Sequence, residues 1–253
     1  MYKIPARTLF MGKRLIYVPE CHSTNDLAVQ ILDQSAAHEG TVVITDRQLQ
    51  GRGQRGNSWI SADFLNLTLS VVLRPTFLRV ADQFFLNIVA SLGVHDTVRQ
   101  LITDPAVFVK WPNDVIVGTR KISGILIENQ IQGGRIQASV VGIGLNVNQI
   151  DFGIPTATSL ALQWGREFEN ASVFEILMEY LEGRYLQLRR GDLDALRRDY
   201  LGALYWRGER RRFAAADREF WGTIAGVDQF GHLQIDSDGA ISAYGMQEIR
   251  YLD

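Results

Sequence analysis

A nine-residue segment, residues 51–59, concentrates residue types that bind anions. It reads Gly-Arg-Gly-Gln-Arg-Gly-Asn-Ser-Trp, with three glycines and two arginines. Glycine lets the backbone approach a ligand closely, and the arginine guanidinium carries a fixed positive charge with several donors. Phosphate is the anion that such a combination of backbone and guanidinium donors suits best. The segment therefore predicts a phosphate-binding loop.

A second group of charged residues lies farther along the chain. It comprises Lys110-Trp111-Pro112-Asn113-Asp114 and Lys121-Ile122-Ser123-Gly124. Lys110 follows the apolar run 107–109, so we expect its ammonium to point into a site. Lys121 begins an apolar strand and can be aimed at a ligand in the same way. Taken singly, each lysine also fits a solvated surface position, which is the usual place for lysine.

The glycines of the loop formally match the dinucleotide-binding pattern Gly-x-Gly-x-x-Gly, at Gly51, Gly53 and Gly56. That pattern must open a helix within a strand-helix-strand unit. Here residues 57–60 lead instead into an alternating strand at 65–73. The sequence therefore does not favour a Rossmann site.

Other segments have both a structural and a functional interpretation. Gly142 and Gly144 interrupt a strand pattern, which indicates either tight packing or the close approach of a ligand. Ser23-Thr24-Asn25 is most simply a helix cap, although its polar groups suit a neutral polar ligand equally well. Cys21 has no base beside it, so a thiol nucleophile is not supported.

Composition argues against several classes of protein. The chain has 253 residues, 46% of them hydrophobic, and a net charge of −2, so no global basic field favours nucleic acid. Cys21 is the single cysteine, which excludes an intrachain disulfide and a cysteine-rich zinc site, and the four histidines lack metal-ligand spacing. No signal peptide and no membrane-spanning segment is visible. We therefore expect a soluble protein of the reducing cytoplasm, with no nucleic-acid or membrane partner.

Strands and helices that would position these residues follow from the hydrophobic periodicity. We expect strands at 14–18, 41–45, 65–73, 107–110, 122–128 and 136–147, and helices at 24–34, 81–101, 174–188 and 193–204. In 65–73 the leucines and the valine occupy alternate positions. This alternation indicates a strand with one buried face in an antiparallel sheet.

The character of the sequence changes after Arg207. Short β-like segments there alternate with turns such as 228–231 and 236–239. We interpret residues 1–206 as an α+β catalytic domain and residues 207–253 as a small C-terminal β-barrel.

Together these segments resemble the biotin protein ligases, or biotin–[acetyl-CoA-carboxylase] ligases. The matching segments occur in the family's order and at family-like spacing, and they are Ser23-Thr24-Asn25, Gln48, Gly51 to Trp59, Lys110 to Asp114, Lys121 to Glu128 and Gly142 to Asn146. The resemblance is specific over residues 14–148 and looser beyond. It implies a mixed, largely antiparallel sheet packed with helices, as in class II synthetase-like domains, and an SH3-like C-terminal barrel.

The reaction that the resemblance implies has two steps. Biotin's carboxylate attacks the α-phosphorus of ATP, which gives biotinyl-5′-AMP and pyrophosphate. A lysine amine of the apo biotin carboxyl carrier protein of acetyl-CoA carboxylase then attacks the activated carbonyl and releases AMP. Because two anions must meet in the first step, fixed cations aimed at their oxygens lower its barrier. Arg52 and Lys121 would supply these cations, with Mg²⁺ held through the substrate phosphates.

The same resemblance assigns the biotin site. The side chains of residues 23–25 and Gln48 would meet the ureido ring, and Lys121 would bind the carboxylate. Glycines would let the backbone close against the ligand. The implied biotin-binding residues are Ser23, Thr24, Asn25, Gln48, Gly51, Arg52, Gly53, Gln54, Lys121, Gly124, Gly142 and Gly144.

The ATP site implied by the resemblance overlaps the biotin site. Asn146 would contact adenine, and Lys110 and Asn113 would lie near the phosphates and magnesium. Asp114 is a candidate magnesium contact and a candidate base for the acceptor amine. The implied ATP-binding residues are Arg52, Gln54, Arg55, Gly56, Asn57, Trp59, Lys110, Asn113 and Asn146.

One departure from the family concerns the N-terminus. Repressor members of the family carry an N-terminal helix-turn-helix domain, whereas only 22 residues precede Ser23 here. We therefore expect the short, catalysis-only form, without operator binding, as a monomer or weak homodimer.

Two alternatives remain open at this point. A lipoate ligase or octanoyltransferase shares the core architecture, although the Gly/Arg loop and the cluster 110–114 favour biotin. A non-catalytic biotin-binding regulatory protein would not need both Arg52 and Lys121. Measuring which acid supports ATP–pyrophosphate exchange would separate the lipoate or octanoate enzymes from a biotin ligase. Biotin binding with no ATP turnover would favour the regulatory protein.

A second departure is Gln54, which stands where many family members have an arginine that helps to retain the activated intermediate. Glutamine donates a hydrogen bond but carries no charge, so we expect weaker retention of biotinyl-5′-AMP. A Gln54→Arg variant should release the adenylate more slowly, as followed by its dissociation rate. An unchanged rate would remove Gln54 from this role.

Overall fold

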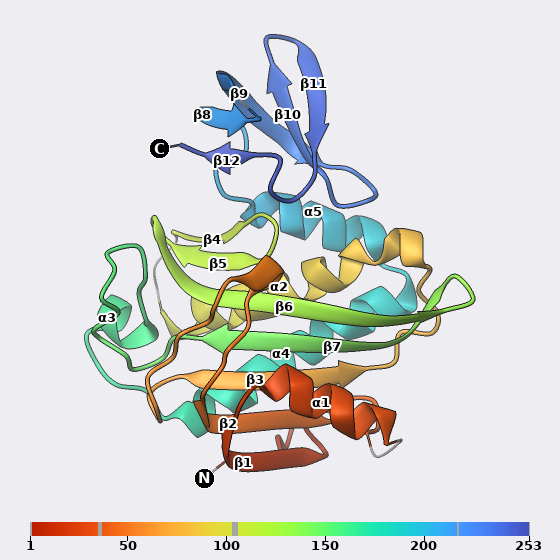
Figure 1. The fold of residues 1–253 in the computed structure, drawn as a ribbon, viewed down its shortest axis with the longest axis vertical. Helices are drawn as coiled ribbons and strands as arrows, with labels where there is room; N and C mark the ends of the chain where they lie inside the picture. Colours follow the sequence, from red (N-terminus) through yellow and green to blue (C-terminus); the bar gives the residue numbers. More distant parts are fainter. Residues whose placement is uncertain (1, 35–36, 103–105, 217, 253) are drawn as a thin grey trace.

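A seven-stranded sheet crosses the larger part of the molecule (Figure 1). The structure is a computed structural model that describes residues 2–34, 37–102, 106–216 and 218–252, without the side chain of Arg55. The strands are β1 (Leu15–Cys21), β2 (Val42–Gln48), β3 (Leu67–Leu73), β4 (Val107–Lys110), β5 (Asp114–Val117), β6 (Arg120–Gln132) and β7 (Arg135–Leu145). Their order is β1-β2-β3-β7-β6-β5-β4. Among these seven strands as described, β1 and β2 pair in parallel and the other neighbours pair antiparallel, which confirms the mixed, largely antiparallel sheet.

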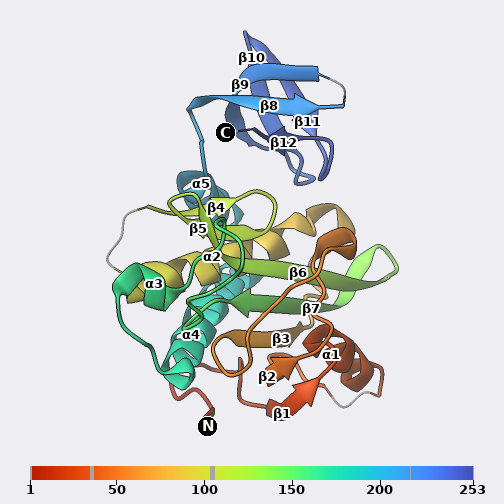
Figure 2. The same cartoon turned by 60° about the vertical axis from the view of Figure 1, so that its left-hand side comes forward.

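Helices cover both faces of this sheet. α1 (Thr24–Asp33) lies on one face and shares a small buried core with β2, β3 and β7. α2 (Phe84–Leu101) and α4 (Asn170–Arg190) lie on the other face, over the main core, and α5 (Leu193–Ala203) packs against α2 (Figures 1 and 2). The predicted cap of α1 is confirmed, because the Ser23 hydroxyl accepts a hydrogen bond from the backbone N–H of Asp26.

Strand β3 differs from its prediction of one buried face, because all seven of its residues are buried. Leu67, Leu69, Val71 and Leu73 face the main core, while Thr68, Ser70 and Val72 face the side that carries α1. Ser70 Oγ lies 2.8 Å from Thr24 Oγ1 and 2.6 Å from Asn25 Oδ1. The polar face is thus covered by the polar start of a helix rather than by water. Its antiparallel pairing with β2 and β7 is as predicted.

A second sheet is formed by the C-terminal part of the chain (Figure 2). Its strands are β8 (Arg210–Ala215), β9 (Arg218–Val227), β10 (Leu233–Ser237), β11 (Ala240–Tyr244) and β12 (Arg250–Tyr251). They pair antiparallel in the order β11-β10-β9-β8-β12. The change in sequence character after Arg207 therefore marks a second β-sheet. That this sheet closes into a barrel stays a prediction.

The sequence analysis did not predict two short elements, strand β5 and helix α3 (Leu160–Trp164). α2 begins at Phe84 rather than at residue 81, because residues 80–82 form a 3₁₀ turn. Over the described residues, the helices are all too short or too polar to cross a bilayer.

Candidate functional site

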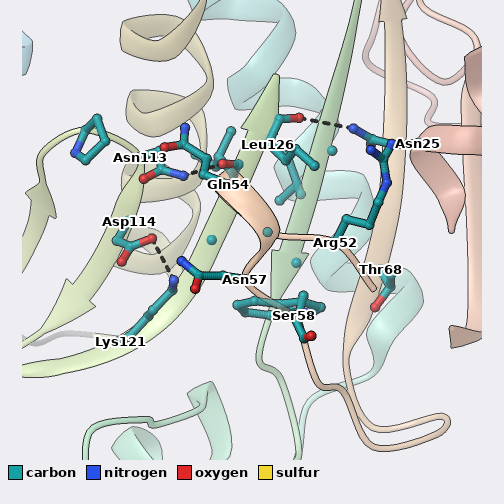
Figure 3. A pocket seen from close by; sticks show the side chains of 18 of the residues that line it. Asn25, Arg52, Gln54, Asn57, Ser58, Thr68, Asn113, Asp114, Lys121 and Leu126 are labelled. Atoms are coloured by element: carbon teal, nitrogen blue, oxygen red, sulfur yellow. Dashed lines mark hydrogen bonds and ion pairs between the residues drawn. The ribbon is translucent and has the colours of Figure 1, made fainter. Parts of the chain in front are cut away.

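A cavity of about 290 Å³ opens where α1, the loop 51–59 and strands β6 and β7 meet (Figure 3). It gathers most of the residues that the sequence assigned to a site. The predicted residues that line it are Ser23, Thr24, Asn25, Gln48, Arg52, Gly53, Gln54, Asn57, Trp59, Asn113, Asp114, Lys121, Gly124, Gly142 and Gly144. Segments distant in sequence therefore converge on one site.

Arg52 reaches this cavity from the loop and is engaged by two carboxylates. Its Nη2 lies 2.6 Å from Asp26 Oδ1 and 2.8 Å from Glu128 Oε2. Asn25 Nδ2 donates to the same Glu128 oxygen at 2.7 Å. The first turn of α1 and the middle of β6 therefore fix the position of the Arg52 charge.

Lys121 lies on the other side of the loop, at the start of β6 (Figure 3). Its ammonium lies 2.7 Å from Asp114 Oδ1 and 5.6 Å from the centre of the Trp59 ring. Arg52 and Lys121 both line the cavity, so one small molecule between them would meet positive charge at either end. This arrangement suits a ligand, or a pair of ligands, that carries more than one anionic group.

Lys110 ends β4 but does not line the cavity. Burial lowers the pKa of its ammonium, the nearby charge of Lys121 lowers that pKa further, and Asp114 raises it. Its Nζ lies 4.9 Å from the centre of the Tyr251 ring. The neighbouring Asn113 does line the cavity and donates its side-chain amide to the carbonyl of Ile125.

Three glycines in β6 and β7 make room for side chains of the site itself. A Cβ at Gly142 would overlap the Asn25 amide, and a Cβ at Gly144 would overlap the indole of Trp59. At Gly124 the neighbours are Trp59 and Lys121. Tight packing, one of the two interpretations of Gly142 and Gly144, is therefore confirmed, and the approach of a ligand stays a prediction.

The closing of the loop depends on Gly51. Its carbonyl accepts a hydrogen bond of 2.9 Å from the backbone N–H of Trp59, and an isolated bridge joins Arg52 to Ser58. A Cβ at Gly51 would overlap the Trp59 carbonyl. Between these ends, residues Gln54–Gly56 form a 3₁₀ turn. The glycines thus bring the two ends of the loop together.

A few predicted site residues lie elsewhere. Gly51, Gly56, Lys110 and Asn146 are absent from the cavity lining among the described residues, and the side chain of Arg55 lies outside the description. Asn146 is 3% exposed, and its Nδ2 donates to the carbonyl of Thr158 at 2.9 Å. It therefore holds the segment before α3 against β7, and its contact with adenine stays a prediction.

Other lining residues were not predicted from the sequence. They are Ser58, Thr68, Leu69, Trp111, Pro112, Ile125, Leu126, Ile143, Met246, Gln247, Ile249 and Tyr251. The polar alternation of β3 could have indicated Thr68. Nothing local indicated the last four, which come from the C-terminal sheet and the turn before β12.

Comparisons with known proteins identify a family for this chain. The model of the biotin/lipoate A/B protein ligase family matches residues 17–146, just over half of the chain. The chain belongs to this family. It is 31% identical to the biotin–[acetyl-CoA-carboxylase] ligase of Mycobacterium tuberculosis over 232 residues, covering 90% of this chain and 85% of the relative. Identity to the Bacillus subtilis bifunctional ligase/repressor BirA is 29%, covering 93% of this chain and 73% of the relative.

Solved structures of the family extend the match to the C-terminal sheet. The biotin protein ligase from Aquifex aeolicus in complex with biotin and ATP superposes with a TM-score of 0.79 at 25% identity. The match covers 95% of this chain and 100% of that chain. Both sheets therefore belong to the family fold.

Gly144 provides a test of how the loop is held down. In a Gly144→Ala variant the added methyl group would displace the Trp59 indole, so we expect trypsin to cleave after Arg52 or Arg55 severalfold faster. Gly183→Ala is the control, because its Cβ would meet nothing within 4 Å and its exposed place in α4 favours alanine by up to ~1 kcal/mol. Equal cleavage of Gly144→Ala and the unmodified protein would contradict the contact.

Proposed function

We propose that this protein is an ATP-dependent biotin protein ligase. It activates biotin as biotinyl-5′-AMP and transfers it to a lysine of the biotin carboxyl carrier protein of acetyl-CoA carboxylase. The proposal rests on one observation above all, that Arg52 and Lys121 open onto the same cavity. The names of the M. tuberculosis and A. aeolicus relatives support the choice of biotin and ATP.

In the first step the biotin carboxylate forms a bond to the α-phosphorus, and the bond to the pyrophosphate oxygen breaks. The two reactants repel each other, and negative charge shifts onto the leaving pyrophosphate. Arg52 and Lys121 offset that repulsion and hold the reacting groups in line. The step needs no protein nucleophile, and Cys21 does not line the cavity.

Before the anions bind, carboxylates hold these cations in place. Arg52 is 43% exposed beside Asp26 at 58%, and Lys121 is 40% exposed beside Asp114 at 27%. Ion pairs with this exposure contribute only about 0–1 kcal/mol each. Substrate anions can therefore replace them at little cost, and the cations need not be reoriented.

Biotin's ureido ring fits the polar end of the cavity. Gln48 Oε1 accepts from the backbone N–H of Thr24 at 2.8 Å, and the Thr24 hydroxyl lies within reach of Gln48 and Ser70. Such a network offers both donors and acceptors to a neutral cyclic urea. The dithiolane of lipoate and the alkyl chain of octanoate carry no groups that could pair with these donors and acceptors, which favours biotin over that alternative.

ATP would lie against the loop 51–59 and the turn between β4 and β5. We propose Lys110 and Asn113 near its phosphates and Asn146 near adenine. Mg²⁺ would be held mainly by those phosphates, with Asp114 as a protein carboxylate within reach, a common arrangement for this ion. The described residues contain no cluster of three or more histidine, cysteine or carboxylate side chains that could hold a metal ion.

In the second step the carrier lysine attacks the activated carbonyl. We propose that Asp114 orients Lys121 for the first step rather than acting as the base for this amine. Its contact with the Lys121 ammonium, at 2.7 Å, favours that role.

We also propose that residues 1–206 and 207–253 are separate domains and that the second is an SH3-like barrel. Five consecutive antiparallel strands after Arg207 support this division. A cytoplasmic location and a monomer or weak homodimer complete the proposal, the location being supported by the single Cys21.

The proposed reaction has a direct test. The protein, labelled biotin, Mg-ATP and an apo carboxyl carrier domain should yield labelled carrier, with AMP and pyrophosphate in equal amounts. Labelled lipoate serves as the matched acid. Biotin binding without ATP turnover would indicate a passive biotin-binding protein instead. Labelling of the carrier with lipoate but not with biotin would indicate a lipoate ligase.

Lys121→Ala should slow adenylate formation by about 10²–10³-fold, since it removes a positive charge aimed at developing negative charge. The measurement is biotin-dependent pyrophosphate release. Lys13→Ala is the control, because Lys13 donates to the carbonyl of Pro5 and does not line the cavity. Near-normal release by Lys121→Ala would show that another residue has this role.

A further inference from the structure

The C-terminal strand β12 brings an aromatic ring to the edge of the cavity. Tyr251 lines the cavity, and its ring centre lies 4.9 Å from Lys110 Nζ. An ammonium at that distance is attracted by the electron-rich face of the ring. Because Tyr251 and Lys110 belong to different sheets, the contact links the C-terminal sheet to the turn that carries Asn113 and Asp114.

The surroundings of Lys110 explain why the ring matters. Lys110 is half-buried at the end of β4, and among the described residues it has no carboxylate within ion-pair distance. The charged groups that act on its pKa are Asp114 and Lys121, and the Asp114 carboxylate is already engaged by Lys121. The Tyr251 ring therefore stabilises the Lys110 ammonium beside the cavity, so that Lys110 and Lys121 do not compete for Asp114.

Tyr251 is itself held rigidly. It pairs with Phe213 across β12 and β8, and its ring centre lies 5.2 Å from that of Trp206 and 5.5 Å from that of Phe213. Its hydroxyl is buried and has no hydrogen-bond partner within the described part of the chain. The packing of the ring, and not a hydrogen bond from the hydroxyl, fixes its orientation.

We propose that Tyr251 is a positioning residue for nucleotide binding, which holds the Lys110 ammonium toward the phosphates of ATP. The inference rests on the proposed function, since it assigns those phosphates to the cavity. It makes the C-terminal sheet part of the nucleotide site, with biotin recognition left to α1, the loop 51–59 and strands β6 and β7.

The test compares three variants by the KM for Mg-ATP in biotin-dependent adenylate formation. Tyr251→Leu, which removes the ring, should raise this KM by about three- to tenfold, the range of a partly desolvated cation–π contact. Tyr251→Phe keeps the ring and should leave the KM unchanged. Tyr244→Leu is the matched control, because Tyr244 stacks on Phe220 in the same sheet and does not line the cavity.

A double substitution of Tyr251 and Lys110 distinguishes a positioning role of Tyr251 from a simple loss of packing. In a Lys110→Met background, Tyr251→Leu should raise the KM no further, while the Kd for biotin alone stays constant in every variant. Additive effects of the two substitutions, or an equal effect of Tyr244→Leu, would overturn the inference. An unmodified protein that forms no biotinyl-5′-AMP would instead refute the proposed function.

A second measurement needs no variant that alters packing. The chain has only four lysines, Lys3, Lys13, Lys110 and Lys121, so reductive ¹³C-methylation gives a simple NMR spectrum. We expect one dimethyl-lysine signal, absent in Lys110→Arg, to be shifted upfield by the ring current and to move on addition of Mg-ATP. A Lys110 signal at the position of exposed lysines, or one insensitive to Mg-ATP, would overturn the inference.

Discussion

The site depends on keeping several positive charges close together around one cavity. Neighbouring positive charges repel one another, and burial makes it more costly to keep Lys110 charged. The structure offsets this with a separate partner for each cation, namely Asp26 and Glu128 for Arg52, Asp114 for Lys121 and the Tyr251 ring for Lys110. The cations are therefore held in place before any substrate anion arrives.

The sheet supplies the geometry that this charge balance needs. β6 carries both Lys121 and Glu128, so one strand holds one principal cation and a carboxylate partner of the other, Arg52. Glycines in β6 and β7 leave the sheet surface bare enough for Asn25 and Trp59 to lie against it. Because β7 pairs with both β3 and β6, the polar start of α1 and the Lys121 end of β6 stay in fixed relation.

Local chemistry made much of this site predictable from the sequence. The loop 51–59, the cap at Ser23 and the cluster 110–114 each combine residue types with a spacing that has a direct physical meaning. Tertiary contacts were not predictable in this way. Glu128 is 76 residues from Arg52 and was assigned to an apolar strand, so its ion pair left no local signal. The short strand β5 and the buried polar face of β3 were missed for the same reason.

The choice of lysine over arginine bears on how the site works. The chain has 22 arginines but only four lysines, and two of those four lie at or beside the cavity. A guanidinium presents several donors in a fixed plane, and one of them, Arg52 Nη2, contacts both oxygens of Glu128 and the carboxylate of Asp26. An ammonium is a compact point charge with rotatable donors, which can follow an oxygen whose charge and position change as a bond breaks. Arginine thus suits the fixed ion pairs at the start of the loop, and lysine suits the end of the cavity where phosphate chemistry would occur.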